Sequence, residues 1–167
     1  NSIYQRVGDF YASAMDTATI DQLGYTPIKP ELDRLAAIST KEEALKEIAM
    51  ERTKGIGGIL YGFYVGQDDK DVNTYIPGFS QGGTTLPDRD YYLKQDAREK
   101  GIREKYIPHI ANMLKLSGES ESDAIKHANT IMAMETTIAK SSMDRVSMRD
   151  PYKLYNKYSS TDFSLKT

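Results

Sequence analysis

Two long stretches in the second half of the chain repeat apolar residues every three or four positions, which is the spacing of one face of an α-helix. The first covers residues 102–116 and contains Pro108, where we expect a kink because proline removes a backbone donor. The second begins at Ser120, whose spacing from Asp123 is typical of a helix cap, and it stops before Asp144. Helices of this length make a mainly α-helical fold the first expectation.

The first half of the chain adds shorter helices. Apolar residues recur on one face from Ile3 to Ala14, as in an amphipathic helix. Thr40 and Glu43 have the spacing of a capping box, which predicts that another helix begins there. We expect Gly55 to end this helix.

One segment, at about residues 59–79, departs from the helical pattern. Residues 59–65 and 72–79 are rich in aromatic and β-branched side chains, and the polar stretch 66–71 lies between them. This pattern predicts an antiparallel β-hairpin, followed by a glycine-containing loop over 80–87. Because no repeat, low-complexity tract or linker interrupts the chain, we predict a single domain over residues 1–167, mainly α-helical with one hairpin.

Composition excludes several classes of function. The 22 basic and 24 acidic residues leave a net charge of -2, so no overall field draws the chain to nucleic acid or to an anionic membrane. The absence of cysteine excludes disulfides, thiolate metal sites and a cysteine nucleophile. The longest weakly polar run, 55–66, has 12 residues, whereas a transmembrane helix needs roughly 20. Since no leader precedes Asn1, we expect a processed or excised segment.

Two short patterns resemble functional motifs, but their context argues against each. Residues 78–82 match the G-x-S-x-G nucleophile elbow with Ser80 at the centre, yet glycines and a proline follow where a helix should begin. Asp69, Asp71 and Asn73 alternate as in an EF-hand loop, but the glycine and the glutamate that should come later are missing. Both segments are therefore interpreted as turns.

The histidines argue against a metal site. His109 and His127 are the only two, they lie on separate predicted helices, and neither begins H-E-x-x-H or another paired ligand spacing. We therefore predict no catalytic residue and no metal ligand in this chain. The 12 tyrosines are the one unusual count, and such side chains serve in a core, at an interface or in a cavity wall.

One segment is distinctive enough to indicate a family: Leu86-Pro87-Asp88-Arg89-Asp90-Tyr91-Tyr92-Leu93, here called the signature segment. It resembles the L-P-x-R-D-Y-Y motif in the N-terminal region of neprilysin-like and endothelin-converting-enzyme-like zinc metallopeptidases. Three further segments are similar to the same region in the same order, at residues 10–16, 64–70 and 149–157, the last beginning Arg149-Asp150-Pro151. Thr84 and Thr85 depart from the family, which usually has a leucine and a small residue there.

The residue types of the signature segment favour a structural role. Pro87 and Asp88 are suited to fix and cap a turn, and the two tyrosines supply bulk. Arg89 and Asp90 are suited to charge-assisted hydrogen bonds within the loop. An arginine without an adjacent base or metal stabilises structure more often than a transition state.

The resemblance implies the rest of the function. In such enzymes zinc is bound by H-E-x-x-H and a later glutamate in a C-terminal domain, and the helical N-terminal part closes over that site as a cap. The enclosed cavity admits oligopeptides and excludes folded proteins. The chain would thus be part of the cap, with the catalytic domain of the same polypeptide as its partner. The family also implies an extracytoplasmic location, and the lack of cysteine favours a bacterial periplasmic, envelope or secreted member.

Two alternatives remain open from the residues alone. A stand-alone helical protein-binding module would account for the many tyrosines and the missing catalytic groups. A self-sufficient hydrolase would use Ser80 as its nucleophile, and Ser80→Ala would then abolish its activity.

Overall fold

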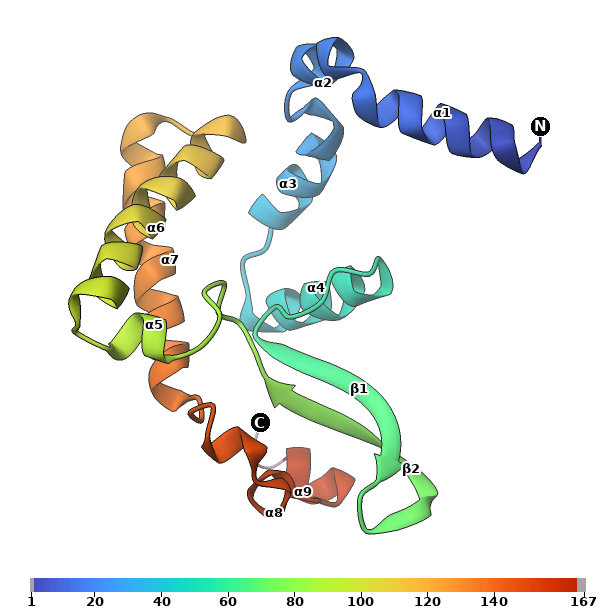
Figure 1. Cartoon of the computed structure of the whole chain (residues 1–167), viewed down its shortest axis with the longest axis vertical. Helices are drawn as coiled ribbons and strands as arrows, with labels where there is room; N and C mark the ends of the chain where they lie inside the picture. The colour runs from blue at the N-terminus through green and yellow to red at the C-terminus, as the bar shows by residue number, and fades with distance from the viewer. Residues whose placement is uncertain (1, 165–167) are drawn as a thin grey trace.

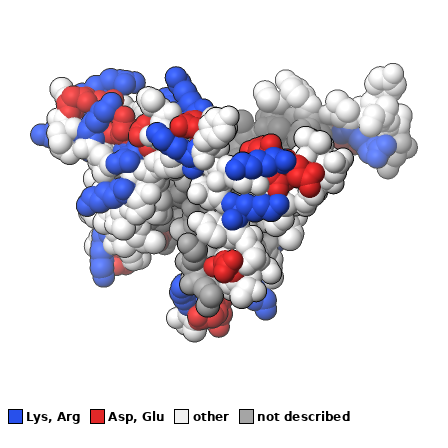
Figure 2. Space-filling model, turned by 90° about the horizontal axis from the view of Figure 1, so that it is seen from below, with Lys and Arg blue, Asp and Glu red and all other residues white. Residues whose placement is uncertain are grey.

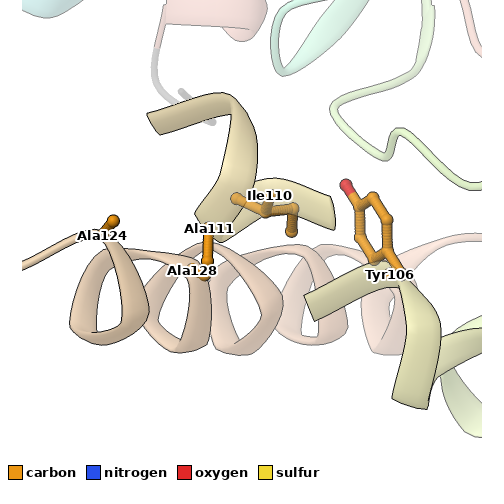
Figure 3. Close-up of a cluster of buried hydrophobic side chains, with 5 residues drawn as sticks. All are labelled: Tyr106, Ile110, Ala111, Ala124 and Ala128. Atoms are coloured by element: carbon orange, nitrogen blue, oxygen red, sulfur yellow. The ribbon is translucent and has the colours of Figure 1, made fainter. Parts of the chain in front are cut away.

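The helices α6 (Ala97–Leu116) and α7 (Glu121–Ser141) lie side by side and form the packed centre of the protein (Figure 1). The structure is a computed structural model, and it describes residues 2–164. Helix α6 runs without interruption through Pro108. Small residues allow the two backbones to approach closely, and the buried cluster between them is made of Tyr106, Ile110, Ala111, Ala124 and Ala128 (Figure 3). The predicted helical pair is confirmed.

The N-terminal part is a series of short helices: α1 (Ile3–Met15), α2 (Thr17–Leu23), the 3-10 turn η1 (Thr26–Ile28), α3 (Lys29–Ala36) and α4 (Lys41–Thr53). Side chains cap the first turns of α1, α2 and α4, and the predicted capping box of Thr40 and Glu43 is present at the start of α4. Helix α1 has no buried residue and extends away from the rest of the protein (Figure 1).

Charges join α3 to α4. Arg34 on α3 pairs with Glu31 on its own helix and with Glu47 and Glu51 on α4, at 2.7 Å from Nη2 to Oε1 of Glu51. Lys54 Nζ lies 2.9 Å from Oε2 of Glu31. The hydrogen bonds from Arg34 and then Lys54 lower the pKa of Glu31 to about 2. This network, more than apolar contact, orients the two helices.

The predicted hairpin is confirmed as β1 (Tyr61–Asp68) and β2 (Asp71–Gln81), paired antiparallel. Its boundaries differ from the prediction of 59–79. The first strand starts later because Leu60 adopts a left-handed φ of 62°, which strand geometry does not permit. The turn is narrower than predicted, since pairing continues to Asp68 opposite Asp71. Because β2 extends to Gln81, the predicted loop begins later.

The C-terminal part, which comes after α7, lies close to the hairpin in space. It contains η2 (Ser147–Arg149), α8 (Pro151–Leu154) and α9 (Ser160–Ser164), and Figure 1 shows α8 and α9 below the sheet. Asp68, at the tip of β1, is 1% exposed and accepts hydrogen bonds from the Tyr155 hydroxyl at 2.9 Å and from Lys157 Nζ at 2.5 Å. The backbone N–H of Lys70 donates to the same carboxylate at 2.9 Å. Asp68 therefore joins the hairpin tip to the C-terminal part.

We predict that Asp68→Asn destabilises the fold in a pH-dependent way. The hydrogen bond from Lys157, and then that from the Lys70 N–H, lowers the pKa of Asp68 from 3.8 to about 2. A lowered pKa means that ionised Asp68 stabilises the folded state fully above about pH 4, and that this contribution is lost as the pH falls through about 2. Urea unfolding at several pH values should therefore show the wild type losing its advantage over the variant between those limits.

The exposed neighbour Asp69 provides the control, because Asp69→Asn changes the same formal charge one residue away. This variant should unfold like the wild type at each pH. An Asp68→Asn deficit that stays the same from pH 6 to pH 2 would contradict the role of the ion pair.

Candidate functional site

The signature segment (residues 86–93) leads from the loop after β2 into the short helix α5 (Asp90–Leu93). Helix α5 lies against both α6 and α7 (Figure 1). Asp88 Oδ1 accepts a hydrogen bond from the backbone N–H of Asp90 at 2.8 Å, which fixes the turn before the helix as predicted for that residue. Leu86 packs against the buried cluster between α6 and α7. The segment is thus placed on the packed centre of the protein.

A single buried carboxylate, Glu135 on α7, accepts the hydrogen bonds that hold this segment. The Tyr92 hydroxyl donates to its Oε2 at 2.8 Å, and the Tyr106 hydroxyl donates to the same oxygen at 3.0 Å. Thr85 donates to Oε1 twice, from its hydroxyl at 2.7 Å and from its backbone N–H at 3.2 Å. Glu135 is 7% exposed, and four neutral donors take the place of its hydration shell.

The tyrosines of this network are held as donors. Tyr92 is 3% exposed, and burial raises the pKa of its hydroxyl, with the neighbouring Glu135 adding to the rise. Burial likewise raises the pKa of Tyr106. Both hydroxyls therefore stay protonated at ordinary pH. Tyr92 also accepts a hydrogen bond from the backbone N–H of Leu86 at 2.9 Å, so its ring closes the loop onto α7.

The charged residues of the signature segment reach other parts of the chain. Arg89 Nη1 donates to the carbonyl of Ser142 at 2.6 Å, just after α7 ends. Asp90 pairs with Lys94 at 2.9 Å, not with Arg89 within the loop as we had expected. Arg103 on α6 donates to the carbonyl of Tyr91 at 2.7 Å. Each contact fixes the segment to a neighbouring element.

Arg149, Asp150 and Pro151, which begin another segment that resembles the family, lie elsewhere. Asp150 accepts from the backbone N–H groups of Tyr152 at 3.0 Å and Lys153 at 3.4 Å, so it caps α8. Pro151 is the first residue of that helix, and Arg149 is the last residue of η2. These residues shape the chain after α7, and they do not contribute to the Glu135 network.

Sequence reasoning missed Glu135 as the centre of this site. The signal was present, because Glu135 falls on the apolar stripe of α7 that runs through Ala124, Ala128, Ile131 and Ile138. A carboxylate at such a position requires buried partners. Tyr106 on α6 is one of them.

Ser80 and the two histidines lie in settings that differ from those of a nucleophile elbow or a metal site. Ser80, the centre of the elbow-like pattern, lies within β2 opposite Gly62 and not on a strand-to-helix turn. Among residues 2–164, no group of three or more His, Asp or Glu side chains could hold a metal ion. His127 on α7 lies 2.8 Å from Glu119, and His109 belongs to α6. The residues described therefore do not fit a zinc site.

An open pocket of about 480 Å³ lies beside Glu135, between α7 and the loops at 57–60 and 83–85. Its walls include Ile131, Met134 and Ile138. The acceptor positions of Glu135 are already used by four donors, so the carboxylate has little capacity left for a ligand. The pocket is suited to an apolar side chain more than to a cation.

Comparison with known proteins identifies the family. The model of peptidase family M13 matches residues 1–167. The endothelin-converting enzyme homolog of Locusta migratoria is 31% identical over 88% of this chain and 21% of its own length. Endothelin-converting enzyme 1 of Mus musculus is 24% identical over 92% of this chain and 20% of its own.

Solved structures agree. The zinc metalloprotease Zmp1 of Mycobacterium tuberculosis in complex with an inhibitor is 34% identical, with a TM-score of 0.81 over 93% of this chain and 23% of that one. The same protease in an open state is 33% identical, with a TM-score of 0.84 over 96% of this chain and 25% of that one. The fold is thus that of a helical region of zinc metalloproteases. The chain belongs to peptidase family M13 and corresponds to its N-terminal region.

The predicted family resemblance is confirmed. The match covers most of this chain but only a small part of each relative. The chain spans about a fifth to a quarter of the length of the relatives that it matches. On the face shown in Figure 2, basic and acidic side chains are interspersed. No helix within residues 2–164 is long and apolar enough to cross a membrane.

We predict that Glu135→Gln lowers the free energy of unfolding by about 1–3 kcal/mol, because an amide replaces an acceptor oxygen among donors that remain buried. Glu121→Gln is the matched control: it is the same substitution in the first turn of the same helix, at a side chain that is 73% exposed. Its effect should stay within about 0.5 kcal/mol. Urea denaturation of both variants measures the difference, and equal stabilities would show that the network does not hold the signature segment.

Proposed function

We propose that this chain is a non-catalytic cap segment of a zinc metalloendopeptidase that cleaves oligopeptides. The observation that carries the proposal is the match of its whole length to the N-terminal region of a peptidase family, in a sequence that contains no H-E-x-x-H. In this role the segment helps to enclose the active-site cavity and limits the size of the substrates that enter. The bond-breaking residues belong to the catalytic domain of the same polypeptide.

The exposed apolar surface supports a covered position in a larger protein. Large hydrophobic side chains with more than half of their surface exposed occur on the N-terminal helices, the hairpin and the C-terminal part, among them Val7, Phe10, Tyr64, Val65, Val146 and Tyr152. Isolated soluble domains rarely expose so many large apolar groups together. Burial against a catalytic domain would remove them from water, at a gain of roughly 25 cal/mol for each Å² covered.

The contribution of the cap to the reaction is access, and no bond-forming step takes place in this chain. Zinc, when bound by the catalytic domain, would supply an activated water for hydrolysis. A rigid wall around that site excludes bulk water and admits only chains thin enough to enter. The packed unit of α5, α6 and α7, fixed by Glu135, has the rigidity that such a wall requires.

The signature segment is proposed to be structural. Its polar contacts hold the segment together or join it to other parts of this chain, as from Arg89 to the Ser142 carbonyl and from Tyr92 to Glu135. We also propose an extracytoplasmic location, in a bacterial periplasm, envelope or secreted form, which membership of the family and the lack of cysteine favour.

The polypeptide that carries this segment should bind one zinc and cleave short peptides while leaving a folded protein that contains the same peptide sequence intact. The chain 1–167 by itself should bind no zinc after dialysis and should cleave neither, because its histidines lack ligand geometry. Metal analysis and peptide cleavage measure both. The alternative of a stand-alone binding module would be supported if the coding sequence downstream held no H-E-x-x-H followed by a glutamate ligand.

Arg89→Ala should lower stability and leave catalysis nearly unchanged. The loss of a charged donor to the Ser142 carbonyl is expected to cost about 1.5–3 kcal/mol. Arg6→Ala, at an exposed side chain of α1, is the matched control and should cost much less. Thermal unfolding and kcat/KM are measured on the whole peptidase. A drop of a hundredfold or so in kcat/KM without loss of stability would instead place Arg89 in catalysis.

A further inference from the structure

The two outer edges of the hairpin are chemically different. Val65 on β1 lies opposite Pro77 on β2, and proline has no N–H to give to a partner strand. In a strand, every second residue directs its main-chain groups to the same side, so Tyr61 has the orientation of Val65. Tyr61 donates its N–H to the Ile59 carbonyl at 2.8 Å, and its carbonyl accepts a hydrogen bond from Arg52. Both observations indicate that every second residue of β1 from Tyr61 to Gln67 directs its main-chain groups outward, away from the partner strand.

On the β1 edge these outward groups belong to Phe63, Val65 and Gln67. All three residues are exposed, Phe63 at 45% and Val65 at 65%. Within residues 2–164, no hydrogen bond reaches their outward N–H and carbonyl groups. An exposed strand edge with large apolar side chains pairs readily with another extended chain. In Figure 1, β1 lies on the side of the hairpin that faces α4, and its end at Asp68 contacts the C-terminal part.

On the β2 edge, the residues whose main-chain groups point outward are Tyr75, Pro77 and Phe79. Pro77 removes the central donor of this edge, a common device by which proteins prevent a further strand from pairing. The Phe163 ring stacks on Phe79 at 4.9 Å, on the face of the sheet that Phe79 shares with Phe63. One edge of the hairpin is therefore blocked, and the other is left open.

We propose that the β1 edge, from Phe63 to Gln67, binds a third strand that comes from the same polypeptide outside residues 1–167. This inference rests on the proposed function, because it needs a longer chain. Two limits define the strand: the carbonyl of Tyr61 is occupied by Arg52 at one end, and the pairing becomes irregular between Gln67 and Asp68 at the other. The partner segment is therefore short, about five residues.

Two considerations favour this occupant over a transient peptide. A two-stranded hairpin is marginal on its own, whereas three strands with an apolar face are stable. The relatives are about four to five times as long as the part that matches, so most of the polypeptide is available to supply a strand. Phe63 and Val65 also share one face and stay exposed here, which indicates a permanent cover more than an occasional ligand.

Hydrogen exchange on the whole peptidase tests the proposal without any substitution. The outward amides of Phe63, Val65 and Gln67 should exchange at least roughly tenfold more slowly than the outward amides of Tyr75 and Phe79 on the blocked edge. In the chain 1–167 alone this difference should disappear. Equal exchange at the two edges of an active, zinc-containing peptidase would overturn the third strand while leaving the proposed function standing.

A pair of proline variants gives a second measurement. Val65→Pro and Tyr75→Pro each remove one outward N–H, from side chains that are 65% and 68% exposed. Val65→Pro should lower the unfolding midpoint of the whole peptidase clearly more than Tyr75→Pro, because only the first removes a hydrogen bond to the added strand. Concentration-dependent dimers of the chain 1–167 that protect the β1 amides would identify a second copy as the occupant and overturn the proposal.

Discussion

A carboxylate without a neighbouring cation is expensive to bury, and its hydration can be replaced only by several well-placed donors. Glu135 has four such donors, and they come from α5, from α6 and from the loop before the signature segment. Because the donors belong to different elements, none of these elements can move without leaving a buried polar group unpaired. The carboxylate therefore fixes the relative positions of three elements more strictly than apolar contact would.

The helices and strands could be predicted from the sequence, whereas the contacts between them could not. The periodic stripes predicted α6 and α7, and the aromatic and β-branched runs predicted the hairpin. The start of β1 was misplaced because the left-handed φ of Leu60 has no counterpart in residue type. The contacts of the signature segment were out of reach for another reason. Tyr92 and Arg89 meet groups 43 and 53 residues away, and no local pattern encodes such a distance.

Thr85 lies at a position where the resemblance to the family led us to expect a small residue. Here the threonine hydroxyl and its N–H supply two of the four hydrogen bonds to Glu135. The path of the loop is tightly limited, because a Cβ at Gly83 would lie 2.8 Å from the Leu60 Cα. Yet the fold matches that of Zmp1 with a TM-score of 0.84. A threonine at this position is thus compatible with the arrangement of elements that the chain shares with Zmp1.

The distribution of burial supports the proposal that a larger protein surrounds this segment. Eight apolar residues among those described are buried, and four of them are alanines, which remove little apolar surface from water. A chain of this length that folded alone would bury roughly two thirds of its unfolded surface around larger side chains. The alanines let α6 and α7 approach closely enough for Glu135 to reach its donors, so they contribute geometry more than hydrophobic stabilisation. The larger hydrophobic side chains instead lie on the N-terminal helices and the hairpin, where the surface of the rest of the polypeptide would complete the core.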